Sequence, residues 1–183
     1  MPHASSRGGA RSPSRRIPLR SALESVDPET VVAVLEPLVS ARRREKILRV
    51  GAQRLDSVTV VMDAPHDPHN GAAVLRSCDA FGIQRVHVVE RRQSFTAANA
   101  VSKGAERWVD VVHHGEVAAA VAALRQTGHT LIATHPEGKL LPAELAQQQR
   151  IALVMGNEHD GICEALAAAC SQRVRVPMRG YVR

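Results

Sequence analysis

Short runs of β-branched and other apolar residues recur along the chain from residue 58 onward, and longer helix-like stretches separate most of them. The predicted strands cover residues 58–62, 86–89, 109–112, 131–134, 151–155 and 174–176. The predicted helices between them cover residues 70–81, 96–106, 116–126 and 160–170. This alternation predicts an α/β fold, in which a mostly parallel sheet carries helices on both faces.

Two more helices are predicted ahead of this pattern. Asp27 followed by Pro28 is typical of a helix start, and Pro37 disturbs the helix that follows. Ser40 can cap a second helix, which ends near Gly51 and is rich in basic residues. We expect five of them to contact RNA phosphates, with a solvated charged face as the alternative: Arg42, Arg43, Arg44, Lys46 and Arg49.

The chain therefore divides into three predicted parts. Residues 1–26 contain arginine, serine and proline but almost no acidic residue, which is typical of a disordered basic tail. Residues 27–54 form a basic helical extension, and residues 55–183 form the α/β domain. A chain of 183 residues can bury the core of one domain of this kind.

The charge of the chain favours a polyanionic partner. Its formal net charge is +6, and arginine supplies 21 of the 24 basic residues. Planar guanidinium groups suit nucleic-acid phosphates, although an arginine-rich composition also follows from codon bias. Aromatic residues make up only 2% of the chain, so recognition by stacking bases on aromatic side chains is disfavoured.

Several functional classes are disfavoured by what the sequence lacks. Its three cysteines (Cys78, Cys163 and Cys170) are odd in number and without metal-ligand spacing, which argues against a disulfide framework or a zinc site and fits a reducing cytoplasm. We expect Cys163 and Cys170 to lie on a helix as small buried residues. The nine histidines show no metal-binding spacing either, so no metal is predicted. No run of 18 apolar residues is present, so no membrane span is predicted.

The residues that follow the predicted strands carry the functional question, because ligands of parallel α/β sheets bind beyond the carboxyl ends of the strands. These segments are residues 63–70, 90–94, 134–136, 156–158 and 177–180. The chain has no Gly-x-Gly-x-x-Gly segment after the first strand and no Gly-Lys-Ser/Thr. Ordinary dinucleotide-binding and P-loop enzymes are therefore disfavoured.

Three blocks at these strand ends stand out. Residues 65–82 contain Asn70 and Arg76, residues 156–158 read Gly-Asn-Glu, and residues 176–180 read Val-Pro-Met-Arg-Gly. Alone, Asn70 could cap a helix and Arg76 could be a surface charge. Asn157 could be a turn residue, and Glu158 an acid placed at the start of the next helix. Their joint occurrence is harder to explain structurally.

Together, the three blocks resemble the motifs of the SPOUT methyltransferases with a deep trefoil knot, specifically the TrmH-type tRNA guanosine 2′-O-methyltransferases. The resemblance runs from about Arg42 to Arg183 and includes residues 103–108. It implies a SPOUT-type fold, S-adenosylmethionine as methyl donor, and catalytic roles for Asn70, Arg76 and Glu158. It also implies that these residues contact or shape the cofactor site: Thr134, Met155, Gly156, Asn157, Val176, Pro177, Met178 and Gly180.

The function implied is 2′-O-methylation of a tRNA ribose, most simply a D-loop guanosine of the position 18 type, by a cytoplasmic homodimer. Methylation of ribosomal RNA instead of tRNA is the alternative. Because a guanidinium is a poor proton acceptor, we expect Arg76 to act mainly by electrostatics.

The third block of the family continues into a Ser-Leu-Asn-Val-Ser stretch and a last helix, whereas this sequence stops at Arg183. We therefore expect an incomplete knot and a partly missing dimer interface. On this interpretation the 183-residue polypeptide by itself binds S-adenosylmethionine weakly or not at all and is inactive. Two alternatives are a non-catalytic RNA-binding remnant and, more weakly, a nucleotide-binding α/β protein unrelated to RNA.

Overall fold

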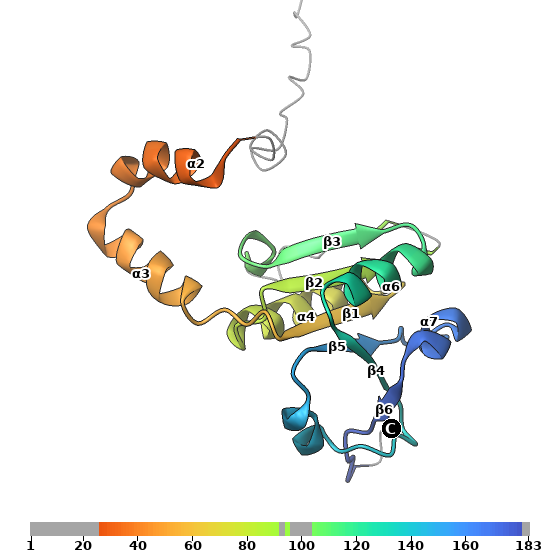
Figure 1. Ribbon diagram of the computed structural model, residues 1–183. Helices are drawn as coiled ribbons and strands as arrows, with labels where there is room; N and C mark the ends of the chain where they lie inside the picture. Colours follow the sequence, from red (N-terminus) through yellow and green to blue (C-terminus); the bar gives the residue numbers. More distant parts are fainter. Residues whose placement is uncertain (1–25, 92–93, 96–103, 181–183) are drawn as a thin grey trace, which may run out of the picture. The chain divides into compact units, whose positions relative to one another are not determined.

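The computed structural model describes residues 26–91, 94–95 and 104–180 (Figure 1). The chain divides into two compact units, Met1–Arg49 and Val50–Arg183. The predicted tail over residues 1–26 lies outside the described residues except for Val26.

The first unit contains the first of the two helices predicted near the start of the chain and most of the second. Helix α2 spans Pro28–Leu35, and the side chain of Asp27 caps it by accepting a hydrogen bond from the backbone N–H of Thr30. The 3-10 helix η1 (Glu36–Leu38) follows at Pro37, where the proline was predicted to disturb the helix. Helix α3 spans Ala41–Gly51, and the Ser40 hydroxyl accepts from the N–H of Arg43, as expected of its cap.

The described residues of the second unit form one six-stranded sheet in the order β3-β2-β1-β5-β4-β6, and every pairing in it is parallel. Its strands are β1 (Val58–Asp63), β2 (Arg85–Val89), β3 (Asp110–His114), β4 (Thr130–Thr134), β5 (Ile151–Met155) and β6 (Gln172–Val174). The predicted α/β class is confirmed. All carboxyl ends therefore meet at one edge of the sheet.

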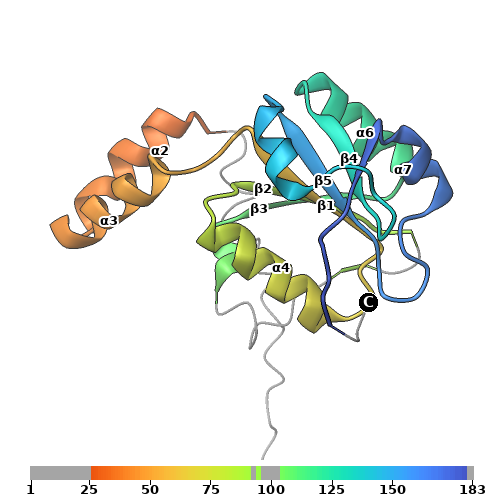
Figure 2. The same ribbon diagram turned by 90° about the horizontal axis from the view of Figure 1, so that it is seen from below.

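Helices cover both faces of the sheet, and this prediction is also confirmed (Figure 2). Helix α4 (Pro68–Ala80) packs Leu75 and Cys78 against one face, while α6 (Val117–Gln126) and α7 (Glu164–Ala169) pack against the other. Short 3-10 helices cover Ala105–Arg107 (η2) and Pro142–Gln147 (η3). Strands buried on both faces explain why the predicted strands are nearly continuous apolar runs.

Some predicted boundaries are wrong. Strand β6 spans Gln172–Val174 rather than residues 174–176. Helix α4 begins at Pro68 rather than residue 70, because Asp67 caps it. Helix α7 begins only at Glu164, since residues 157–163 form turns, so Cys163 and Cys170 flank it as its caps. Both cysteines are half-buried against the core, and burial raises the pKa of Cys170 to about 11. The predicted helix over residues 96–106 falls mostly outside the described residues.

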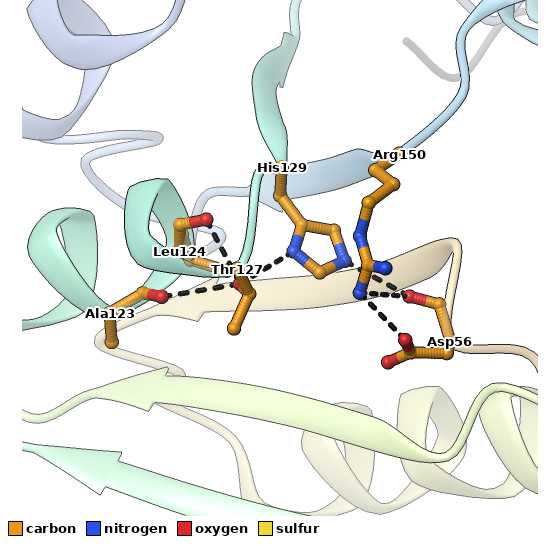
Figure 3. Close-up of polar contacts among 6 residues, drawn as sticks. All are labelled: Asp56, Ala123, Leu124, Thr127, His129 and Arg150. Atoms are coloured by element: carbon orange, nitrogen blue, oxygen red, sulfur yellow. Dashed lines mark hydrogen bonds and ion pairs between the residues drawn. The ribbon is translucent and has the colours of Figure 1, made fainter.

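A polar cluster joins the segments that precede β1, β4 and β5, at the amino ends of these strands (Figure 3). Arg150, just before β5, donates to the backbone oxygen and the carboxylate of Asp56 at 3.1 and 2.8 Å. The ring of His129, just before β4, lies between Asp56 and the hydroxyl of Thr127. This cluster is at the edge of the sheet opposite the predicted site.

Within the described ranges, no helix is long and apolar enough to cross a membrane. The same residues contain no group of three or more potential ligands able to hold a metal ion.

Candidate active site

The start of α4 holds the first predicted site residue, Asn70. Asp67 caps this helix, because its side chain accepts from the backbone N–H of His69 at 2.8 Å. Asn70 lies inside the first turn, so the alternative that it caps the helix is wrong. Its amide instead donates a hydrogen bond to the carboxylate of Glu158. Two residues 88 positions apart in sequence are thus joined.

The turn after β5 presents Glu158. The Asn157 side chain accepts from the backbone N–H groups of His159 and Asp160 at 2.9 and 2.8 Å, and Asn157 pairs with Gly161 through their backbones. A Cβ on Gly156 would lie 2.2 Å from the carbonyl carbon of Gly161, so only glycine fits there. The structure therefore gives Asn157 the turn-forming role that was the structural alternative for this residue. Glu158 lies in the turn before helix α7 and not at the start of that helix.

The carboxylate of Glu158 is held in its charged form. The hydrogen bond from Asn70 lowers its pKa below the usual range, with a further contribution from backbone hydrogen bonding. The side chain is exposed, so it is open to a ligand as well as to Asn70.

The Asn70–Glu158 pair spans neighbouring strands. β1 and β5 lie side by side, with Met62 in register with Met155. The chain leaves β1 toward α4 on one face and leaves β5 toward α7 on the other (Figures 1 and 2). Such a point, where successive connections go to opposite faces, opens a crevice that parallel α/β proteins use to bind ligands.

Two cavities adjoin this crevice and share the segment after β4 as a common wall. The first has a volume of about 460 Å³ and includes Thr134, Gly156 and Asn157 in its lining. The second, of about 650 Å³, is lined by Thr134–Glu137 on one side and by residues 174–178 on the other. The hydroxyl of Thr134 donates to the backbone oxygen of Val154 at 3.0 Å and so ties this wall to β5.

Six of the eight predicted cofactor residues line these cavities. Thr134, Gly156 and Asn157 belong to the first, and Val176, Pro177 and Met178 belong with Thr134 to the second. The other two are placed differently. The side chain of Met155 packs against the core, which leaves only its backbone near the site, and Gly180 lines neither cavity.

The lining combines apolar and polar groups, as sites for small organic ligands do. Ala133, Ile162 and Ala167 supply apolar surface in the first cavity, and His135 and Arg173 add polar groups. Its size is within the range of about 300–1,000 Å³ typical of ligand pockets. Sequence reasoning placed residues 134–136 at a strand end but did not select His135 or Pro136, and it missed Arg173.

Arg76 lies on α4 with an exposed side chain. Its guanidinium makes no hydrogen bond or ion pair with any residue that the structure describes, so it is available to an anionic ligand. In the first unit, the basic residues of α3 are likewise exposed, and Arg44 is paired with Glu36.

Asp63, at the end of β1, is a site-forming residue that the sequence did not reveal. Its fully buried carboxylate accepts from the guanidinium of Arg91 at 2.8 and 3.3 Å and from the backbone N–H of Cys163 at 2.6 Å. Burial alone would lower the pKa of Arg91, but the hydrogen bond and the charge of Asp63 raise it overall. One carboxylate thus joins the ends of β1 and β2 to the start of α7.

The fold and the cavities define an open parallel α/β protein with a candidate ligand site beyond the carboxyl ends of β1, β4 and β5. The sequence signature of the SpoU rRNA Methylase family matches residues 57–183. The chain belongs to this family.

Known relatives agree with this assignment. The chain is 31% identical over 142 residues to the tRNA (guanosine(18)-2′-O)-methyltransferase of Escherichia coli K12, an alignment that covers 77% of this chain and 62% of the relative. The A. aeolicus TrmH/SpoU tRNA modifying enzyme shares the fold, with a TM-score of 0.66, 22% identity, and coverage of 76% and 72% of the two chains.

A second solved structure was determined with a ligand. The SpoU methyltransferase AviRb from Streptomyces viridochromogenes, in complex with the cofactor AdoMet, matches with a TM-score of 0.55 and 27% identity, over 72% of this chain and 51% of that one. The described sheet and its neighbours thus confirm the predicted SPOUT-type fold.

Proposed function

We propose that the protein containing these 183 residues methylates a ribose 2′-hydroxyl of tRNA, with S-adenosylmethionine as donor and a D-loop guanosine at position 18 as the target. The observation that carries this proposal is the hydrogen bond between Asn70 and Glu158, which unites two motif blocks beside the cavities after β4 and β5. The tRNA and the guanosine are supported by the names of relatives such as the E. coli enzyme.

The cavities suit the proposed cofactor in size and in the mixture of groups that line them. When bound, S-adenosylmethionine supplies an electrophilic methyl group on a sulfonium centre. We assign the adenosine and methionine parts to the walls formed by Thr134, Gly156 and Asn157 and by Val176, Pro177 and Met178. Met155 and Gly180 would contribute through backbone only.

Arg76 is proposed to hold the phosphate next to the target ribose and to stabilise charge that develops on the 2′-oxygen. Asn70 and Glu158 would position the nucleotide beside it. A planar guanidinium can bind two phosphate oxygens at once, whereas lysine offers a single point charge. We therefore expect Arg76→Lys to lose at least about 100-fold in methyl transfer, within the range for removal of one charge-stabilising group. Turnover near that of the parent protein would refute this role.

The substrate is proposed to reach the site with the help of the basic face of α3. Replacing Arg42, Arg43, Arg44, Lys46 and Arg49 by glutamine should weaken tRNA binding and flatten its dependence on salt, because fewer phosphate counterions are released. Filter binding between 50 and 200 mM salt measures both.

A homodimer in the cytoplasm is the assembly and location we propose.

The direct test is transfer of tritium-labelled methyl groups from S-adenosylmethionine to unmodified tRNA by the full natural protein. Arg76→Ala is the inactive control, and tRNA with adenosine at position 18 tests the target. Transfer to ordinary tRNA only would support the whole proposal. Transfer to ribosomal RNA instead would replace the substrate, and RNA binding without any transfer would favour the non-catalytic alternative.

A further inference from the structure

The ring of Phe95 lies against the first turn of α4 and has no part in the function described so far. Phe95 belongs to the segment after β2, and only 8% of it is exposed. A Cβ built on Gly71 would lie 2.3 Å from Cε2 and 2.4 Å from Cζ of this ring. The ring therefore occupies the space that a side chain at residue 71 would need.

This close approach gives a physical reason for glycine at residue 71. Glycine is disfavoured inside a helix compared with alanine, because it loses more conformational freedom on folding. Gly71 lies within α4 and does not have the positive φ that would require glycine. What remains is the ring of Phe95, which only a residue without a side chain can approach so closely.

The carboxylate of Glu90, just after β2, fixes the segment that carries the ring. Its oxygen Oε1 accepts the backbone N–H of Phe95 at 2.7 Å and contacts Nδ1 of His113 on β3 at 2.8 Å. The ring itself belongs to the cluster of buried side chains that includes Leu75 of α4. Because both the backbone and the side chain of Phe95 are held, the ring is a firm support for the helix start.

The support affects the candidate site through Asn70, the residue before Gly71. Gly71 is buried against the ring, whereas the side chain of Asn70 is exposed and donates its hydrogen bond to Glu158. A hydrogen bond weakens steeply when its length or angle departs from the preferred range. The position of the backbone at residue 71 therefore decides whether the amide of Asn70 reaches Glu158.

We infer that Phe95 is a positioning residue, whose ring, held by Glu90, sets the place of Asn70 relative to Glu158. This inference rests on the proposed function, in which Asn70 and Glu158 position the nucleotide. Phe95 lines neither of the two cavities, so it acts through Asn70 and not on a ligand directly.

The test exchanges the sizes of the two residues in contact. In Gly71→Ala the new methyl group overlaps the ring, and relief of the overlap needs a shift on the order of 1 Å, because carbon atoms prefer separations of about 3.5–4.0 Å. Leucine at residue 95 lacks Cε2 and Cζ, and the remaining close atom, Cδ2 of the ring, is already at 3.5 Å. In the double variant the methyl group of Ala therefore takes the space of the missing ring atoms.

The readout is the rate of single-turnover methyl transfer to tRNA by the full natural protein at saturating S-adenosylmethionine. Gly71→Ala should lose on the order of 100-fold and Phe95→Leu about tenfold, as expected when a positioning group is displaced. The double variant should recover to within about threefold of the parent, because the two changes compensate each other at one contact. Affinity for tRNA should stay within about threefold in all three variants.

A second comparison separates positioning from a purely structural role. When Asn70 is already replaced by alanine, Gly71→Ala should cost less than about threefold in rate, because the residue through which it acts is gone. Urea unfolding of every variant measures stability in parallel. A double variant of Gly71 and Phe95 that is no faster than Gly71→Ala would overturn the inference, even if its stability recovered.

Phe81→Leu is the matched control, because Phe81 caps the other end of α4 and is 76% exposed. Its rate should equal that of the parent. A parental rate in Gly71→Ala, in Phe95→Leu or in Asn70→Ala would overturn the inference alone, as would a loss explained by weaker tRNA binding. No transfer by the parent would overturn the proposed function itself.

Discussion

At the scale of single residues, the first turn of α4 shows how a helix start can leave its side chains free for chemistry. Asp67 satisfies the helix N-terminus, so Asn70 is released from capping and bonds Glu158 instead. The same carboxylate also fixes the ring of His69. One aspartate therefore serves the helix and the candidate site together.

Gly156 is the residue on which the turn after β5 depends most directly. In Gly156→Ala the new Cβ would lie 2.2 Å from backbone of Gly161, so the turn must open. We expect a loss of about 1–3 kcal/mol in the free energy of unfolding, typical of overpacking, and at least a tenfold loss in the affinity of the full natural protein for S-adenosylmethionine. Urea unfolding and calorimetric titration measure the two effects.

Gly115→Ala is the control for this prediction, because no atom lies within 4 Å of a Cβ at that position. Its stability should stay within about 0.5 kcal/mol of the parent. If both alanine variants behaved alike, the close approach of Gly156 to Gly161 would not be what holds the turn.

At the scale of elements, Asp63 is the feature that holds the site together. It joins β1 to the segment after β2 through Arg91 and to the start of α7 through Cys163. Each of these elements ends at the candidate site. A buried carboxylate with three hydrogen bonds has a single satisfied arrangement, so it fixes the relative positions of the three elements.

Replacing Asp63 by asparagine should therefore lower the free energy of unfolding. The variant keeps the shape of the side chain but leaves Arg91 without its counter-charge, and we expect a loss of about 3 kcal/mol in the free energy of unfolding. Asp56→Asn, in the exposed pair with Arg150 at the other edge of the sheet (Figure 3), should lose less than about 1 kcal/mol. Equal losses in chemical denaturation would contradict a special role for Asp63.

Most of the strands could be predicted from the sequence, whereas the start of α7 and the contacts between distant segments could not. The strands other than β6 were predictable because β-branched runs buried on both faces have few other uses in a chain of this length. The start of α7 was not, because residues 157–163 are held by an asparagine turn and by Gly161 at φ 67°, whereas the apolar spacing continues regardless. The contacts of Asp63 and the bond from Asn70 to Glu158 join distant segments, and no local pattern encodes such pairs.

At the scale of the whole second unit, the core lies on both faces of the sheet and includes polar groups. His87 on β2 is buried and shares a 2.8 Å contact between its Nδ1 and Nε2 of His114 on β3. Burial, followed by the neighbouring charges of His114 and Arg85, lowers the pKa of His87 from 6.5 to about 4. The pKa values of His114 and His129 are lowered as well, chiefly by burial. The lowered pKa values favour the neutral form of His87, His114 and His129 in the folded protein.

This arrangement predicts a loss of stability in mild acid. As pH falls below 6.5, His87 becomes protonated in the unfolded chain but stays neutral in the folded one until about pH 4. The unfolded state then binds more protons, so its stability relative to the folded state increases. The contribution of His87 is present in full above pH 6.5 and is lost progressively toward pH 4. We expect a decrease on the order of 1–2 kcal/mol in the free energy of unfolding from this residue.

Urea unfolding at several pH values between 7.5 and 4.5 measures this dependence, and two glutamine variants identify its source. His87→Gln should be less stable than the parent at pH 7.5, because glutamine does not reproduce the packing of the ring, but its stability should fall less on acidification. Arg125→Gln, at an exposed position whose side chain does not titrate in this pH range, should keep the parental slope. A parental slope in His87→Gln would instead assign the acid sensitivity to His114, His129 or the carboxylates, since it would show that protonation of His87 does not differ between the folded and unfolded states.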